Sequence, residues 1–392
     1  MLIALPISLI SLFVMVVARP FIRIRVGFLR CDRIGHFAAN TELYLCERDF
    51  IKNNDQTLDL FYFPRKVCNQ QLANMWKRKT HVFPWFWLRP ICLIIRSFDC
   101  LAAYRVIEGR GGDRDIDNLL DQIPPHLEFT AEEEKRGKAG LRAMGIPNGA
   151  AFVCLTVRDS AYLAQHYTGS DASYHNYRDS DIQNYILAAD VLADRGYFVI
   201  RMGAKANEPM KSTHPNIIDY ASNGMRSDFM DIYLCAKCVF CISTGTGLDA
   251  IPEMLRRPIV YVNIVPLAYI HTFRADFLCI TKRHVLKGSQ QILTLKEIFT
   301  QNVGFCIASS DYQSKGVDLI ENTPEEIRDV VIEMVERLEG VWQPDEADES
   351  LQRKFWEIFP VNAVGHDGVP LHGEIRSRYG ANFLRKNRWW LE

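Results

Sequence analysis

The stretch that decides the fold is VFCISTGTGLDAIPEMLRRPIVYV, residues 239–262. It begins with a short apolar run, continues into a glycine-rich turn at Ser243–Gly247 and a helical segment containing Pro252, and ends in an apolar run from Ile259. This order predicts strand, turn, helix and strand. Proline is tolerated there because the first N–H groups of a helix have no partner within it. Units of this kind build a parallel sheet.

The same alternation extends upstream and downstream of this stretch. Strands are expected at 151–157, at 197–203 and around Ile217, with a helix from Asp181 to Asp194 between the first two. Downstream, Thr323 and Pro324 mark the start of a helix that lasts to Leu338. Strands that alternate with helices of ~10–15 residues predict a doubly wound parallel sheet.

A second, shorter array precedes this one. Residues 23–30 combine β-branched and aromatic side chains and run into a turn at Cys31–His36, after which 37–49 has helical character. The pattern from 57 to 127 is less regular. Two Rossmann-like arrays in one chain predict an α/β fold with two doubly wound domains facing a cleft.

A helical segment separates the two arrays. Thr130 followed by Glu133 is the pattern of a capping box, and the helix that it opens is expected to last to about Met144. The predicted parts are an apolar anchor helix, an N-terminal domain, a helical linker, a C-terminal donor domain and a tail packing back toward the N-terminal domain: 1–20, 21–128, 129–149, 150–340 and 341–392.

The N-terminus has the pattern of a membrane anchor. Residues 2–18 carry no charge, and five arginines follow between Arg19 and Arg33. At ~1.5 Å per residue this run just reaches across a ~30 Å hydrocarbon core. The positive flank follows the run, so we expect anchoring at the cytoplasmic face of a membrane. A buried core helix is the alternative, and the aromatic stretch 83–95 fits both a bilayer interface and a core.

Charge and cysteine content exclude other classes. The 46 Lys and Arg residues against 47 Asp and Glu give a net charge of −1, so no positive field is available to hold a nucleic acid. The 11 cysteines are scattered over a chain of 392 residues, which favours a reducing compartment over a disulfide framework.

The decisive stretch resembles the donor-site segment of bacterial glycosyltransferases of the two-Rossmann (GT-B) type. In heptosyltransferases of that type, a Ser/Asp-Thr-Gly turn follows a strand and an Arg-Pro precedes the next one, as Thr244–Gly245 and Arg257–Pro258 do here. Asp249 stands where heptosyltransferases have histidine, so their sugar specificity is not carried over. Three further runs are similar to a group of bacterial surface-polysaccharide glycosyltransferases: 177–182, 196–203 and 380–387.

The resemblance implies transfer of a sugar from a nucleotide-sugar to a hydroxyl of a surface glycan or of a lipid-linked glycan precursor. The nucleotide-sugar would be a substrate, and no cofactor or metal is implied. A departing nucleotide needs positive charge or aligned N–H groups. The resemblance also implies that an acidic residue near the turn accepts hydrogen bonds from the ribose hydroxyls. The expected donor and phosphate-binding residues are Arg158, Arg201, Gly203, Lys205, Ser243, Thr244, Gly245, Thr246, Gly247 and Glu253.

The acceptor hydroxyl needs a base. His36 follows the first predicted strand, and an imidazole with an ordinary pKa of ~6.5 suits this role near neutral pH. Enzymes of this fold with a base in the corresponding loop support His36, with Asp32 as second choice. The alternative is that His36 caps the following helix or contacts phosphate.

Two other functions stay open. A nucleotide-sugar epimerase of the same architecture would need no acceptor. A non-catalytic nucleotide-sugar-binding scaffold subunit would bind the donor without turnover.

Three further patterns are better explained by structure than by metal binding. Cys235, Cys238 and Cys241 flank a predicted buried strand, where free cysteine acts as a small apolar residue. The Asp113–Asp117 run lacks the glycine of a calcium loop and is expected to be a solvated loop. The run Asp179–Asp181 lies at a helix start, where it caps.

Overall fold

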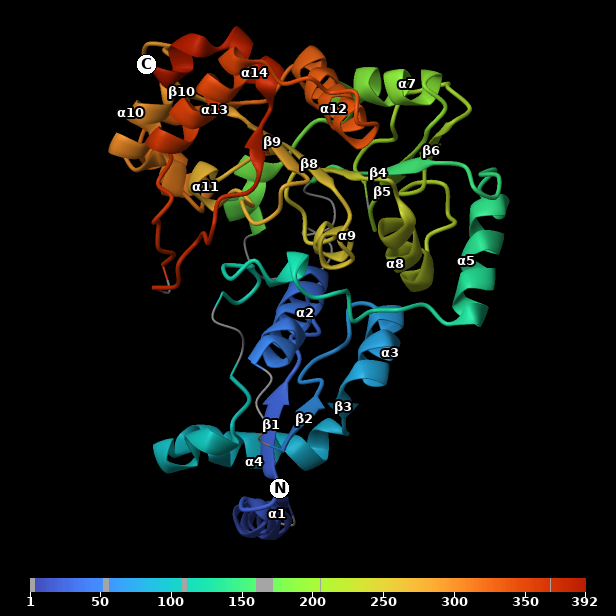
Figure 1. Ribbon diagram of the computed structural model, residues 1–392, viewed down its shortest axis with the longest axis vertical. Coiled ribbons are helices and arrows are strands. Elements are labelled where there is room, and N and C mark those ends of the chain that lie inside the picture. Colours follow the sequence, from blue (N-terminus) through green and yellow to red (C-terminus); the bar gives the residue numbers. More distant parts are fainter. Residues whose placement is uncertain (1–3, 52–55, 108–110, 160–171, 205, 367) are drawn as a thin grey trace.

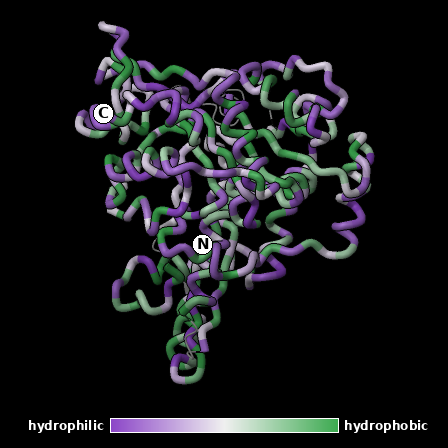
Figure 2. The backbone as a smooth tube through the Cα atoms, turned by 45° about the horizontal axis from the view of Figure 1, so that its top comes forward, coloured by the Kyte–Doolittle hydropathy of each residue, from purple (hydrophilic) through white to green (hydrophobic). Residues whose placement is uncertain are grey.

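The computed structural model describes residues 4–51, 56–107, 111–159, 172–204, 206–366 and 368–392 (Figure 1). Within these residues the chain is of the mixed α/β class, and its two larger sheets are built from parallel strands. The expected α/β class is therefore confirmed. Apolar stretches run through the interior of the molecule (Figure 2).

The smaller sheet lies in the N-terminal part of the chain. Its described strands are β1 (Arg23–Phe28), β2 (Thr57–Tyr62) and β3 (His81–Val82), in that order and all parallel. Helix α2 (Ile34–Ile51) follows β1, and α3 (Gln70–Lys79) follows β2. The turn expected at Cys31–His36 is shorter than predicted: α2 begins at Ile34, so Gly35 and His36 lie in its first turn.

Two apolar helices lie side by side at the end of this unit (Figure 1). Helix α1 (Ala4–Ala18) packs against α4 (Trp85–Ser97), and a 3₁₀ turn, η1 (Asp99–Tyr104), follows α4. Leu12 and Met15 of α1 share a separate small core with the buried face of α4. None of the helices in the described ranges is long and apolar enough to cross a membrane. Anchoring by residues 1–20 stays a prediction.

The larger sheet has seven strands among the described residues. Their order is β12-β9-β8-β7-β4-β5-β6, and all neighbours are parallel. An antiparallel ribbon of β10 and β11 accompanies it. The strands are β4 (Phe152–Thr156), β5 (Phe198–Met202), β6 (Ile217–Asp219), β7 (Cys241–Ser243), β8 (Ile259–Ile264), β9 (Phe277–Thr281), β10 (Arg283–Leu286), β11 (Val317–Ile320) and β12 (Arg378–Tyr379).

Helices connect and cover these strands (Figure 1). They include α12, whose bounds agree with the sequence prediction. The helices and 3₁₀ turns of this unit are η3 (Ala172–Arg178), η4 (Ile182–Tyr185), α7 (Ile186–Asp194), α8 (Asp228–Lys237), α9 (Ala250–Met254), η5 (Leu267–Tyr269), α10 (Leu295–Thr300), η6 (Val303–Phe305), α11 (Ser309–Ser314), α12 (Pro324–Leu338), α13 (Glu346–Ile358), α14 (Ala381–Lys386) and η7 (Arg388–Leu391).

The predicted linker helix is confirmed. Helix α5 (Ala131–Ala143) begins with a complete capping box, in which the Thr130 side chain accepts from the Glu133 N–H and the Glu133 carboxylate accepts from the Thr130 N–H. Gly137 and Gly140 let α5 approach α8, because a Cβ at Gly137 would lie 2.1 Å from the Tyr233 ring. The linker is therefore packed against the larger unit. The proposed domain limits themselves stay a prediction.

The C-terminal tail lies mainly on the larger unit, and part of it also contacts the segment before the linker. Residues 341–392 were expected to pack back toward the N-terminal domain, but β12 pairs with β9 in the larger sheet. Phe355 of α13 stacks 4.4 Å from Tyr379 of β12, and this aromatic cluster is apolar enough to fix the tail on that sheet. Residues 371–376 contact the segment before the linker, where Arg114 Nε donates to the Leu371 carbonyl at 2.6 Å and Arg376 Nη1 donates to Asp121. Packing of the tail toward the N-terminal domain stays a prediction.

The two units meet where α2 contacts α9 (Figure 1). Phe37 and Leu43 of α2 belong to the same buried cluster as Ile251 and Met254 of α9. Because this core is continuous, the first turn of α2 is held against the turn after β7.

Candidate functional site

Internal hydrogen bonds fix the turn that is predicted to bind the donor. The buried Ser243 hydroxyl donates to Asp249 Oδ2 at 2.6 Å and accepts from the Gly245 N–H at 3.0 Å. Thr244 Oγ1 accepts from the Arg158 N–H at 2.9 Å. Both hydroxyls are thus used inside the protein, and the turn exposes Gly247 instead. Asp249 supports the turn through its hydrogen bond with Ser243, and burial raises the pKa of this carboxyl to about 6.

Two arginines flank the turn. The Arg178 Nη2 group donates to the Gly245 carbonyl, and Arg158 Nε donates to Asp179 Oδ1 at 3.2 Å. Burial, followed by the charge of Arg178, lowers the pKa of Arg158. Within the described residues, Arg178 Nε is buried with no hydrogen-bond partner. The turn therefore lies in a positive environment that favours an anion.

The pKa of His175 reflects the same positive environment. Burial, followed by the charges of Arg178 and Arg158, lowers the pKa of His175 to about 4. Burial also lowers the pKa of Lys282, whose ammonium group donates to the Asp179 carbonyl. Sequence reasoning missed Arg178 as a site residue, although it lies in the run 177–182 that carries the resemblance.

The first turn of α2 reaches this glycine-rich turn. A Cβ placed on Gly35 would lie 3.2 Å from both Cα and the carbonyl oxygen of Gly247, so the two backbones touch. The structure thus brings together the two segments that the sequence assigned to the base and to the donor phosphate. Their contact places His36 one residue from the junction.

His36 has a carboxylate partner that the sequence did not suggest. Its Nδ1 lies 3.3 Å from Asp113 Oδ2 and 3.1 Å from Asn40 Oδ1. Both partners are acceptors, so Nδ1 carries the hydrogen and Nε2 keeps the lone pair that a base needs. The hydrogen bond to Asp113 raises the pKa of His36 above 6.5.

The acidic run that contains Asp113 is therefore different from the solvated loop that we expected. Asp113 is half exposed but paired with His36. Asp115 is buried and accepts from the N–H groups of Leu119 and Leu120 at 2.7 and 2.9 Å, which caps η2 (Leu119–Asp121). Burial raises the pKa of Asp115 to about 6.

Other predicted residues lie apart from the turn or have structural partners. Asp32 forms an ion pair with Arg65 at 2.7 Å. Arg201 is 3% exposed and donates to the Glu208 carbonyl at 2.5 Å and to Asp219 at 3.2 Å. It lies on β5, which is separated from β7 by β4 in the sheet.

Glu253 is 2% exposed and lies 3.2 Å from His271, so it is engaged in the interior rather than presented to a ribose. Gly203 directly follows β5, and Thr246 is half-buried in the turn. Lys205 lies outside the described residues.

One set of side chains has the spacing of a metal site. Glu42, Cys46 and His126 bring potential ligand atoms within 4.8 Å of one another. Arg256 Nη1, however, lies 2.8 Å from Glu42 Oε1 and supplies the positive charge there. A metal ion would be repelled by this guanidinium, so we interpret the set as a buried ion cluster that joins the two units. The cysteines at 235, 238 and 241 are buried in the main core.

Fold and site together define an α/β protein in which a histidine–carboxylate pair adjoins a turn flanked by arginines. A search of family models and of curated proteins finds no match to the sequence.

Among solved structures, the chain is similar to Escherichia coli ADP-heptose lps heptosyltransferase II, with 14% identity and a TM-score of 0.44 over 80% of this chain and 98% of that one. It is also similar to a family 9 glycosyl transferase from Veillonella parvula, with 10% identity and a TM-score of 0.46 over 80% and 97%. A third match is the E. coli heptosyltransferase WaaC with ADP-2-deoxy-2-fluoro heptose, at 11% identity and a TM-score of 0.31 over 66% and 93%.

Proposed function

We propose that this protein is a GT-B-type glycosyltransferase that uses no metal. It moves a sugar from a nucleotide-sugar to a hydroxyl of a surface glycan or of a lipid-linked glycan precursor. The observation that supports this is the junction of Gly35 and Gly247, which joins the first turn of α2, where His36 pairs with Asp113, to the turn flanked by Arg158 and Arg178.

The chemistry of each group follows from its surroundings. Nε2 of His36 accepts the proton of the acceptor hydroxyl, and the acceptor oxygen forms a bond to the anomeric carbon of the donor. The bond from that carbon to the phosphate oxygen breaks, and its electron pair stays on the nucleotide. Arg178 and Arg158 stabilise the negative charge of that leaving group, which is how a metal-free site lowers the barrier.

A nucleotide panel tests the donor site. We expect one of UDP, GDP, CDP, CMP, TDP and ADP to raise the melting temperature of the full chain. A ligand at a hundredfold excess over its Kd stabilises the native state by ~2.7 kcal/mol. Arg178→Gln should weaken the binding of that nucleotide roughly 10- to 150-fold, because a hydrogen bond to a charged group contributes ~1.5–3 kcal/mol.

The matched control is Arg142→Gln on α5, where the arginine is exposed and bonds Asn148. This variant should bind the nucleotide as the native chain does. A panel with no shift, or equal affinity in the Arg178→Gln variant, would remove the donor site from this turn.

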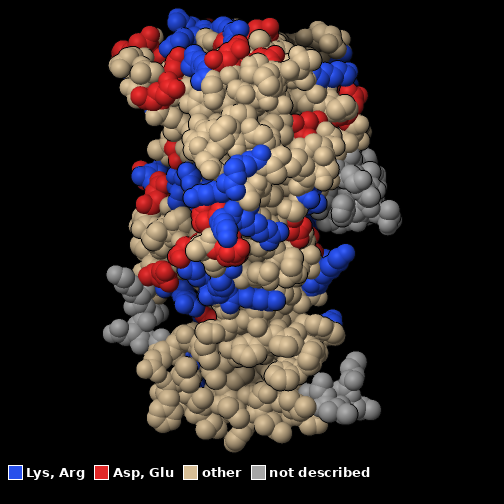
Figure 3. Space-filling model, turned by 90° about the vertical axis from the view of Figure 1, so that its right-hand side faces the viewer, with Lys and Arg blue, Asp and Glu red and all other residues tan. Residues whose placement is uncertain are grey.

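We also propose that the protein docks on the cytoplasmic face of a membrane through an apolar cap formed by α1 and α4. One end of the molecule carries almost no charged side chains, and Lys and Arg side chains border it (Figure 3). Apolar helices with aromatic residues and a basic rim bind lipid interfaces in this way. The exposed side chains of the apolar cap are Ile7, Leu9, Ile10, Phe13, Val14, Val16, Val17, Trp85, Phe86, Trp87 and Leu93.

Vesicle binding tests the apolar cap. The native chain should sediment with phosphatidylcholine–phosphatidylglycerol vesicles, and Trp85→Ser/Trp87→Ser should weaken this at least tenfold, because burial of one large apolar side chain contributes ~1.5–3 kcal/mol. Trp389→Ser, which changes an exposed tryptophan of η7, is the control. Equal binding by the native chain and the double variant would refute docking through this cap.

A further inference from the structure

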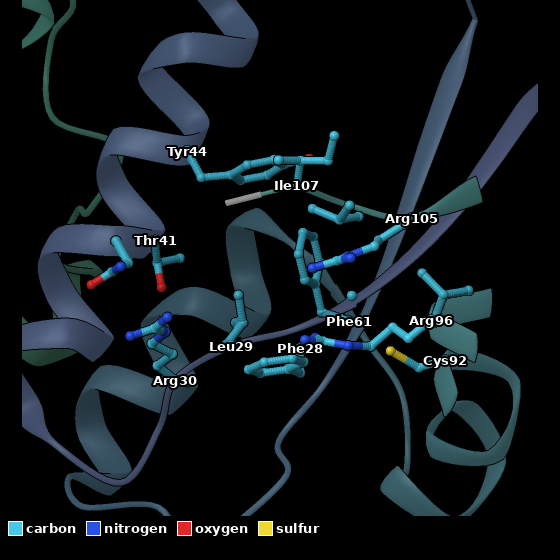
Figure 4. Close-up of a pocket in the computed structure, with 14 residues that line it drawn as sticks. Phe28, Leu29, Arg30, Thr41, Tyr44, Phe61, Cys92, Arg96, Arg105 and Ile107 are labelled. Carbon is cyan, nitrogen blue, oxygen red and sulfur yellow. The ribbon is translucent and has the colours of Figure 1, made fainter. Parts of the chain in front are cut away.

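A cavity of about 320 Å³ lies between β1, α2, α4 and the segment 105–107 (Figure 4). The segment extends the small sheet, because Arg105 pairs with Val26 of β1 and the Val106 N–H donates to the Val26 carbonyl at 3.1 Å. Phe28 and Phe61 give the cavity an apolar floor. Its volume is at the lower end of the ~300–1,000 Å³ range of small-molecule sites.

Three arginines line this cavity. Arg96 and Arg105 point into it from one side, and Arg30 lies on the opposite side (Figure 4). Arg96 lies over the Phe28 ring at 5.4 Å. In the part of the chain that the structure describes, neither Arg96 nor Arg105 has a carboxylate partner. Both residues are exposed to solvent, and the part of their side chains that lines the cavity adds positive charge beside its apolar floor, an arrangement that suits an anionic ligand.

The cavity connects two features described above. On one side Arg96 and Cys92 belong to α4, whose other face forms part of the apolar cap. On the other side Asn40 lines the cavity and also contacts His36 through its Oδ1 at 3.1 Å. A ligand in this cavity therefore lies between the proposed membrane surface and the proposed base.

We infer that this cavity binds the phosphate or diphosphate group of a lipid-linked acceptor. Arg30, Arg96 and Arg105 hold the anion, and the lipid chain leaves along α4 toward the membrane. The sugar hydroxyl on the other side of the anion then faces Asn40 and His36. This inference rests on the proposed glycosyltransferase function and names the acceptor class for it.

Calorimetric titration of the full chain tests the cavity, with farnesyl diphosphate as a soluble lipid diphosphate and inorganic pyrophosphate as the free anion. We expect farnesyl diphosphate to bind at least tenfold more tightly than pyrophosphate, since only the former reaches the apolar surface. Arg96→Gln/Arg105→Gln should weaken farnesyl diphosphate at least tenfold. Arg89→Gln is the matched control, because Arg89 lies on α4 over the Trp85 ring and outside the cavity.

The nucleotide that stabilises the native chain is titrated into the same variants, which separates the two proposals. Unchanged nucleotide binding with lost farnesyl diphosphate binding supports the cavity. Unchanged farnesyl diphosphate binding in Arg96→Gln/Arg105→Gln overturns the cavity proposal and leaves the donor site unaffected. Displacement of farnesyl diphosphate by that nucleotide has the same meaning. Equal affinity for pyrophosphate and farnesyl diphosphate overturns the lipid part. Lipid diphosphate binding that depends on these arginines, in a chain that binds no nucleotide, supports the cavity and refutes the transferase.

Discussion

Turnover of the His36→Ala variant is expected to fall by about 10²- to 10⁴-fold, the range for removal of a general base. Its affinity for the donor nucleotide should equal that of the native chain, because the arginines proposed to bind the leaving group, Arg178 and Arg158, contact Gly245 and Asp179 and not His36. Initial rates of sugar transfer, measured beside nucleotide titrations, provide the comparison. Equal rates in the two proteins would exclude His36 as the base.

The pH profile distinguishes a base from a merely structural histidine. Asp113 raises the pKa of His36, so the acidic limb of kcat/KM should lie above pH 6.5. Asp113→Asn removes the carboxylate that stabilises the imidazolium, and the limb should move to lower pH. A limb that stays in place after this substitution would show that the titrating group is another residue.

The Arg256→Ala variant is expected to lose about 1–3 kcal/mol of unfolding free energy, the cost of removing one hydrogen-bond partner from a buried charged group, because His126 Nδ1 stays 3.3 Å from the Glu42 carboxylate. Glu42 is fully buried, and Arg256 Nη1 lies 2.8 Å from it. The same guanidinium donates to the carbonyls of Leu120 and Ile123 at 2.8 and 2.7 Å, so one side chain connects α2, the segment before the linker and the end of α9. Urea denaturation followed by circular dichroism measures the loss.

Arg195→Ala is the control for this comparison, because Arg195 is an exposed arginine at the end of α7. Its unfolding free energy should stay within ~0.5 kcal/mol of the native value. If Arg256→Ala were as stable as this control, the ion cluster would not join the two units.

Local patterns were sufficient for much of the fold. The capping box at Thr130, the start of α12 at Pro324 and the turn after β7 each depend on residues a few positions apart, and the structure has all three. The aromatic stretch around Trp85 fitted both a core and an exposed interface because α4 has one face of each kind: it buries Leu88 on one face and exposes Trp85 on the other.

The pairings at the candidate site were beyond sequence reasoning. His36 and Asp113 are 77 positions apart, and Arg178 meets Gly245 across 67 positions, so each contact depends on how distant loops pack. Burial of Glu253 had the same origin, since the partner His271 comes from another loop. Spacing along the chain carries no information about such pairs.

Gly35 and Gly247 bring the first turn of α2 close to the turn after β7. A Cβ on Gly35 would lie 3.2 Å from Gly247 Cα, which is tighter than ordinary contact by a few tenths of an ångström. Rates of reaction between bound partners are sensitive to shifts of ~1 Å. In the proposed site, a side chain in place of Gly35 would widen the distance between the proposed base and the donor turn by a few tenths of an ångström, so that distance depends on this glycine.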